Sequence, residues 1–253
     1  MDIFQAVMLM GIGLVGGLWN AVAGGATLFT FPALMAAGLP PIIANTTNYV
    51  ALLPSNAAAL PACKDELRGL GRTLVPLLVV SGLGAICGSL MLLVSDAEVF
   101  SALIPFLILA ATCLFAFGDR LRERLLAVSS AATGQKLLYG VLFICSIYGG
   151  YFGAGLGIIL LGLAQIMGFR DFHVANSIKN LLATNFTILS IIVFNLGGLI
   201  AWPEAFTIMV GSTLGGFAGG HLSKRANQAV LRAVVIVFGF ALSIVYFYKQ
   251  FLA

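Results

Sequence analysis

Charged side chains are scarce in this sequence: they make up 9% of its 253 residues, whereas apolar side chains make up 60%. A soluble domain usually contains about 25% charged and about 45–50% apolar residues. The mean hydropathy of +1.08 is too high for a soluble core to bury, so lipid must solvate much of the surface. The formal net charge of +4 is confined to a few short loops. We therefore expect the lipid bilayer as a partner, and no nucleic acid.

Side chains suited to metal binding or acid–base chemistry are also sparse. The four cysteines form no Cys-x-x-Cys pair and have no histidine beside them, so the spacing of a zinc or iron–sulfur site is missing. No carboxylate lies within an apolar run, where it could relay protons or bind a cation. The acidic residues, all in expected loops or at helix ends, are Asp2, Asp65, Glu66, Asp96, Glu98, Asp119, Glu123, Asp171 and Glu204. We expect no enzyme, no catalytic residue, no metal site and no cofactor.

Long apolar runs are abundant. A membrane-spanning helix needs about 20 mostly apolar residues, because the hydrocarbon core is about 30 Å thick. Five runs have about this length: residues 72–94, 99–117, 179–202, 204–222 and 229–248. Two runs are shorter, at residues 47–62 and 136–151. Three more runs are interrupted or bounded by glycines, at residues 3–23, 27–38 and 156–168. The sequence predicts an all-α integral membrane protein.

The chain repeats itself at an offset of 131 residues. Ala44-Asn45-Thr46 recurs as Ala175-Asn176-Ser177. Further pairs at this offset are Gly24 with Gly155, and Gly84-x-x-x-Gly88 with Gly215-x-x-x-Gly219. One register held over both halves indicates an internal duplication. We expect two repeats of about five helical segments each, at residues 1–118 and 137–253, joined by a linker at 119–136. Small-residue motifs such as Gly84-x-x-x-Gly88 favour close helix packing.

The charged loops indicate how the two repeats are oriented. The loop after the third helix is basic in the first repeat, with Lys64, Arg68 and Arg72, and its counterpart in the second repeat has no lysine or arginine. The loop between the fourth and fifth helices is acidic in the first repeat, with Asp96 and Glu98. In the second repeat this loop is basic, with Lys224 and Arg225. Basic loops stay cytoplasmic, so the repeats are expected to be inverted. The protein would then cross the membrane several times, with the linker cytoplasmic and both termini outside.

Inverted repeats are typical of secondary transporters. They bind solute near the midplane, and the rocking of one half against the other opens the site to each side in turn. We therefore expect alternating access. An anion channel with the same fold remains an alternative. A homodimer is compatible with the sequence, which leaves the oligomeric state, the transport direction and the coupling ion open.

Glycine-rich stretches occupy matching places in the two repeats, at residues 19–27 and 149–157. They predict short helices broken near the midplane, where backbone N–H groups and helix dipoles can hold an anion. The candidate binding residues here are Asn20, Gly24, Gly25, Thr27, Gly153 and Gly155. Close packing of helices through small residues is the alternative interpretation. Whether the first two helices of each repeat span the bilayer or form a re-entrant hairpin stays open.

The recurring Asn-Thr and Asn-Ser motifs supply further polar candidates at the expected start of the third helix of each repeat. They are Asn45, Thr46 and Asn48 in the first repeat, and Asn176, Ser177, Lys179 and Asn180 in the second. Amides and hydroxyls suit the oxygens of an oxyanion, although they could also cap the helix. Lys179 begins an apolar run, so its charge is either functional or reaches the membrane interface.

The order of these motifs resembles the sulfite exporter TauE/SafE family over essentially the whole chain. The resemblance rests on the glycine-rich breaks, on Phe31-Pro32 and Gly38-Leu39-Pro40-Pro41, and on the repeated Asn-Thr and Asn-Ser motifs. It implies an inner-membrane permease for sulfite, an organosulfur or sulfonate anion, without a cofactor. We expect a secondary transporter for such a small anionic solute. A carrier of small organic carboxylates is the alternative on the substrate side.

Overall fold

The protein is helical throughout the part of the chain that the computed structural model describes, residues 3–22, 25–57, 60–128, 134–222 and 228–252. The α-helices are α1 (Ile3–Val22), α2 (Thr27–Ala36), α3 (Pro41–Ala57), α4 (Lys64–Arg68), α5 (Leu74–Leu93), α6 (Ala97–Val128), α7 (Gln135–Tyr151), α8 (Leu156–Ile166), α9 (Phe172–Leu196), α10 (Trp202–Leu222) and α11 (Gln228–Phe251). Short 3₁₀ turns, Pro61–Cys63 and Gly71–Thr73, flank α4.

Five described segments are long and apolar enough to cross a membrane. They are Ile3–Asn20, Gly71–Leu93, Ala97–Arg124, Phe172–Leu196 and Ala233–Phe251. Large apolar side chains on their outer surfaces are exposed, for example Ile188 at 43% and Val237 at 68%. Such surfaces are stable only in contact with lipid. The prediction of an all-α membrane protein with several spans is confirmed.

Three helices differ in their limits from the expected apolar runs. α3 and α9 begin at Pro41 and Phe172, six or seven residues before the expected starts at 47 and 179, and α6 continues to Val128, into the stretch expected as linker. Proline suits the first position of a helix because its missing N–H has no partner there. Asp171 caps α9 by accepting from the backbone N–H groups of His173 and Val174. Hydropathy marks the apolar part of a helix and overlooks its polar first turns.

Two pairs of helices, α1 with α10 and α5 with α7, pack at very close range. A Cβ atom added to Gly84 would lie 2.6 Å from the carbonyl oxygen of Phe143, and one on Gly88 would overlap the carbonyl of Ile147. A Cβ atom added to Gly215 would likewise overlap the carbonyl of Leu14 in α1. The expected packing role of these glycines is confirmed. Both pairs join a helix of one sequence half to a helix of the other.

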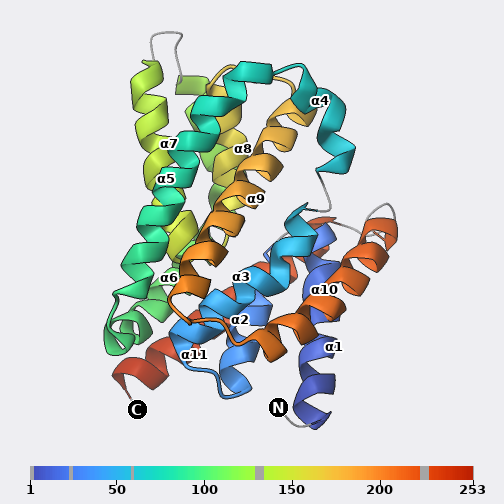
Figure 1. Cartoon of the computed structure of the whole chain (residues 1–253), viewed down its shortest axis with the longest axis vertical. Helices are drawn as coiled ribbons and strands as arrows, with labels where there is room; N and C mark the ends of the chain where they lie inside the picture. The colour runs from blue at the N-terminus through green and yellow to red at the C-terminus, as the bar shows by residue number, and fades with distance from the viewer. Residues whose placement is uncertain (1–2, 23–24, 58–59, 129–133, 223–227, 253) are drawn as a thin grey trace.

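The molecule therefore has two lobes that do not coincide with the sequence halves. The first lobe contains α1, α2, α3 and α10, and the second contains α5, α6, α7, α8 and α9 (Figure 1). α3 packs against α9 where the lobes meet. α11 packs along α6 of the second lobe, and its Phe238 stacks on Phe29 of α2 at 4.6 Å between ring centroids, so α11 bridges the two lobes. Each lobe therefore contains helices from both sequence halves.

The two glycine-rich stretches separate the arms of helical hairpins. α1 packs against α2 and α7 against α8, and the second arm of each pair turns back toward the end from which the first arm started (Figure 1). α1 runs upward in the view and α7 downward, and α5 and α10 also run in opposite directions. The first two helices of each half thus form a hairpin within the molecule, and α1 is also long and apolar enough to span a membrane.

Candidate functional site

The break between α7 and α8 is a tight turn that only glycine can form easily. Gly153 and Gly155 have φ angles of 74° and 77°, in the left-handed region that strains residues with a side chain. The Tyr148 hydroxyl donates to the Ala154 carbonyl at 2.7 Å and closes the turn. No side chain caps the start of α8. The first N–H groups of α8 therefore remain available to a ligand or to water.

The break between α1 and α2 has the same character. Gly25 has a φ of 82°, and a Cβ atom on it would lie 2.6 Å from the Phe115 ring. No side chain caps α2 at Ala26. Asn20 lies half-buried in the last turn of α1, and Thr27 is the first residue of α2. Gly24, the remaining candidate in this stretch, lies outside the described residues.

Helix α3 directs one polar face toward the break between α7 and α8. Asn45, Asn48 and Tyr49 are spaced i, i+3 and i+4, so they share a face of the helix, and all are buried. The Asn45 amide donates to the Tyr151 carbonyl at 3.0 Å. The Tyr49 hydroxyl donates to the Gly149 carbonyl at 2.5 Å. These two bonds tie α3 of the first lobe to the end of α7 in the second.

The same face is connected to α2. The Thr30 hydroxyl lies 2.5 Å from Asn48 Oδ1 and 3.0 Å from the Ala26 carbonyl, so its single hydrogen serves one acceptor at a time. Phe31 meets Phe152 edge to face, with centroids 5.6 Å apart. We call Thr30, Asn45, Asn48 and Tyr49, with the carbonyls of Gly149 and Tyr151, the central polar cluster. It joins the two hairpins through α3.

Asn45 leaves one polar atom of this cluster unsatisfied. Its residue is fully buried, and its Oδ1 has no hydrogen-bond partner. The orientation of the amide follows from its neighbour, because the Tyr151 carbonyl can only accept and must therefore face the NH₂ group. A buried acceptor without a partner is costly. The cluster thus presents a carbonyl oxygen that requires a donor from water or from a bound molecule.

Thr46, which was predicted to bind the solute, forms hydrogen bonds to backbone carbonyls of the protein instead. Its hydroxyl donates to the Leu199 carbonyl and lies 3.1 Å from the Ile43 carbonyl. The neighbouring Thr47 hydroxyl accepts from the backbone N–H of Ala201 at 3.0 Å. Both threonines therefore fasten α3 to the loop between α9 and α10. The expected N-cap role does not apply, because the motif begins four residues inside a helix that starts at Pro41.

The candidates on α9 form a second group, close to the start of α8 and to the turn before α4. A Cβ atom on Gly157 would lie 3.8 Å from Lys179 Cδ. The Asn180 amide donates to the buried Cys63 sulfur at 3.8 Å. Ser177 donates to the His173 carbonyl of its own helix at 2.8 Å. Asn176 is half-buried one turn into α9.

Some members of the site were not among the sequence candidates. Tyr49 could have been found, since it follows Asn45 by four residues and must share its face. Thr30 and Cys63 carry no such signal. Thr30 lies within an apolar helix, and Cys63 reaches α9 across 117 positions. Only the packing brings these two side chains to the predicted residues.

Helices of membrane-spanning length, two glycine-broken hairpins and a buried polar cluster between them define the class: a polytopic membrane transporter rather than an enzyme. The model of the family described as "Sulfite exporter TauE/SafE" matches residues 9–246. The chain belongs to this family.

Curated relatives agree with the assignment. A "Probable membrane transporter protein" of Haemophilus influenzae is 32% identical over 255 residues, covering 96% of this chain and 94% of that protein. The "Probable membrane transporter protein YfcA" of Escherichia coli K12 is 26% identical over 245 residues, covering 91% and 85%. The "Probable membrane transporter protein ORF9" of a Sinorhizobium species is 25% identical over 234 residues, covering 91% and 87%. No solved structure matches the chain significantly.

Proposed function

We propose that the protein is a secondary transporter that moves a small anion, sulfite or an organosulfur or sulfonate anion, across the inner membrane by alternating access. The observation that carries this proposal is the bond from Asn45 to the end of α7. It brings the polar face of α3 to the place where α8 starts without a side-chain cap. A binding site between the two hairpin breaks could open to each side of the membrane in turn, as alternating access requires.

Inverted repeats are part of the proposal, and three observations support them. The first residues of α3 and α9, Pro41 and Phe172, are 131 positions apart. The hydroxyl of Ser81 donates to the Leu78 carbonyl, and the Ser212 hydroxyl donates to the Met209 carbonyl at the same offset. Equivalent helices run in opposite directions in Figure 1.

The orientation proposed for the chain follows from the basic residues. α4, which carries Lys64 and Arg68, lies at the same end of the molecule as the last turn of α6 and the first turn of α7 (Figure 1). The first turn of α1 and the last turn of α11 lie toward the other end. Basic segments remain cytoplasmic, which favours a cytoplasmic α4 end and termini outside.

Alternating access would use the lobes rather than the sequence halves as moving bodies. The glycine contacts between α5 and α7 and between α1 and α10 interlock backbones within a lobe. Between the lobes, α3 meets α9, and α11 bridges from α6 to α2. We propose that the lobes rock about these contacts and that Asn45 breaks its bond to Tyr151 as they separate.

Several features favour an anion as cargo. The uncapped start of α8 offers N–H groups, and the starts of α2 and α8 present the positive ends of helix dipoles. Lys179 beside Gly157 brings a positive charge to the start of α8. The free Asn45 Oδ1 favours a cargo that also carries a hydrogen-bond donor, and hydrogen sulfite has one. A carrier of small carboxylates would use the same groups, and an anion channel could share the fold.

Flux into liposomes tests the proposal. We would reconstitute the protein and measure uptake of sulfite beside sulfate, thiosulfate, taurine and sulfoacetate, with and without a potassium-diffusion potential. Saturable uptake of one sulfur anion, with counterflow from a preloaded interior, is the expected result. Non-saturating flux would indicate a channel. Flux of carboxylates and none of any sulfur anion would overturn the substrate assignment while leaving the transporter class intact.

A further inference from the structure

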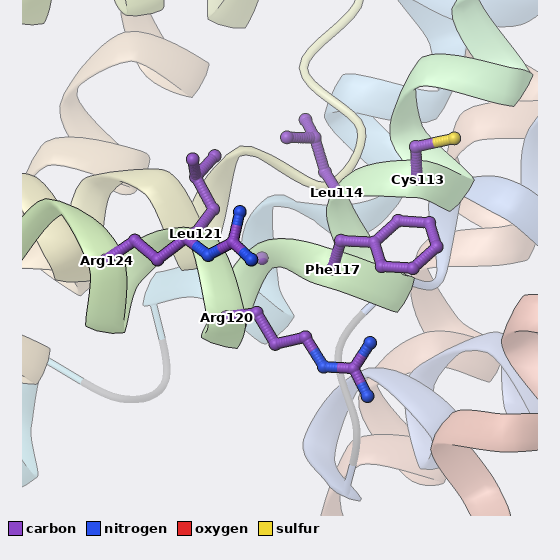
Figure 2. Close-up of a pocket in the computed structure, with 7 residues that line it drawn as sticks. Cys113, Leu114, Phe117, Arg120, Leu121 and Arg124 are labelled. Carbon is purple, nitrogen blue, oxygen red and sulfur yellow. The ribbon is translucent and has the colours of Figure 1, made fainter.

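The far end of α6 carries a hollow whose arginines were not among the candidate site residues. Its volume is about 420 Å³ (Figure 2). The lining residues are Cys113, Leu114, Phe117, Gly118, Arg120, Leu121 and Arg124. Figure 2 shows Phe117 and Arg120 projecting from the same stretch of α6, with Arg124 extending toward Leu121.

The hollow lies at the edge between the inner and outer faces of α6. Two of its lining residues pack inward: a Cβ atom on Gly155 would lie 3.4 Å from Leu114 Cβ, and one on Gly118 would lie 2.7 Å from the side chain of Ile158 in α8. Phe117 and Leu121 point outward and are 52% and 44% exposed. Apolar side chains exposed on a membrane-spanning helix contact acyl chains. The outer wall of the hollow, at Phe117 and Leu121, is therefore a lipid contact.

Two positive charges stand at the end of this apolar wall. Arg120 and Arg124 are one turn apart and therefore share the outer face, in the last part of the span Ala97–Arg124. Successive residues of a helix are rotated by about 100°, so Asp119 lies on another face. Glu123 follows Arg120 by three residues and lies at the edge of the outer face, where the two guanidinium groups still leave a net positive charge.

We propose that this hollow binds a phospholipid with an anionic headgroup. The acyl chain lies along Phe117 and Leu121, and the phosphate lies beside Arg120 and Arg124. Guanidinium groups are suited to phosphate because they are planar, always charged and weakly hydrated. Basic pockets beside membrane helices bind anionic headgroups in the same way. Arginines that simply reach water from a helix end would need no hollow beside them.

Lipid binding to the purified protein in detergent tests the proposal. Native mass spectrometry would compare phosphatidylglycerol with phosphatidylcholine on the wild type, on R120Q/R124Q, and on the control R72Q/K136Q, which removes two exposed charges elsewhere. Phosphatidylglycerol should bind the wild type and the control more tightly than phosphatidylcholine does. Its affinity for R120Q/R124Q should fall about 30-fold, because each basic residue contributes about fivefold.

Equal affinity of the wild type for the two lipids would overturn the proposal, and so would an unchanged affinity for phosphatidylglycerol in R120Q/R124Q. A third contrary outcome is that soluble glycerol phosphate displaces phosphatidylglycerol as well as unlabelled phosphatidylglycerol does, which would mark a site for free anions. If R120Q/R124Q does not fold, F117W gives a second test. Brominated phosphatidylglycerol should quench the added tryptophan fluorescence more strongly than brominated phosphatidylcholine. Equal quenching would reject the site.

Discussion

Asn45 and Tyr151 are joined by a hydrogen bond of 3.0 Å across 106 positions of the chain, from the side-chain amide of one to the main-chain carbonyl of the other. The bond links α3 of the first lobe to the last residue of α7 in the second. A main-chain acceptor cannot be altered by substitution, so the strength of this connection is set by residue 45 alone.

Replacing Asn45 with alanine should therefore impair transport. The change removes the only side-chain donor to the Tyr151 carbonyl among the described residues, and a buried group left without its partner costs about 1–3 kcal/mol. We expect sulfite flux to fall at least tenfold. Ser101→Ala is a control, because the Ser101 hydroxyl donates to the Ala97 carbonyl of its own helix and its loss should leave flux unchanged. Wild-type flux in the Asn45 variant would exclude the cluster from transport.

Lys179→Met should weaken anion binding at the start of α8. A hydrogen bond to a charged group is worth about 1.5–3 kcal/mol, so the concentration of sulfite that gives half-maximal flux should rise about tenfold or more. Lys136→Met, at the exposed first turn of α7, removes the same charge away from the proposed site and serves as the control. If both variants saturate at the wild-type concentration, Lys179 is not part of the site.

Gly88→Ala and Gly140→Ala form a pair that separates packing from helix propensity. A methyl group on Gly88 would collide with the backbone of α7, whereas nothing lies within 4 Å of one on Gly140. Gly88→Ala should lower the midpoint of thermal unfolding in detergent, with a cost of about 1–3 kcal/mol for overpacking. Gly140→Ala should leave it unchanged or raise it slightly. Similar midpoints in the two variants would contradict the close packing of α5 and α7.

Removing the cap of α9 should have a pH-dependent effect. The backbone N–H groups of Val174 and His173 donate to the Asp171 carboxylate and lower its pKa. Because the pKa of Asp171 is lower in the folded state than in the unfolded state, the ionised carboxylate stabilises the folded protein at pH values above the unfolded-state pKa. This stabilisation is lost as the pH falls through the folded-state pKa. Asp171→Ala should therefore unfold at a lower temperature than the wild type at neutral pH, and the difference should shrink in acid. A difference that does not change with pH would show that the carboxylate charge contributes nothing.

The sequence predicted the helices well because apolar length and glycine punctuation are local properties. It placed the breaks at Gly25 and at Gly153 with Gly155, where the backbone has positive φ. It could not predict which helices pack together. The contact of Cys63 with Asn180 and the engagement of Thr46 with Leu199 depend on segments more than 100 positions apart. Hydropathy reports how deeply a residue lies in the membrane, not which neighbour it faces.

The exchange of helices between the halves has a consequence for how such a chain could arise. The glycine surface of α1 is covered by α10, and that of α5 by α7, so a chain ending after α6 would leave both surfaces bare. A single half could cover them only by pairing with a second copy that supplies the missing helices. On the proposed duplication, the ancestor would have been an obligate pair of short polypeptides, and the fusion of the two would have fixed their proportion at one to one.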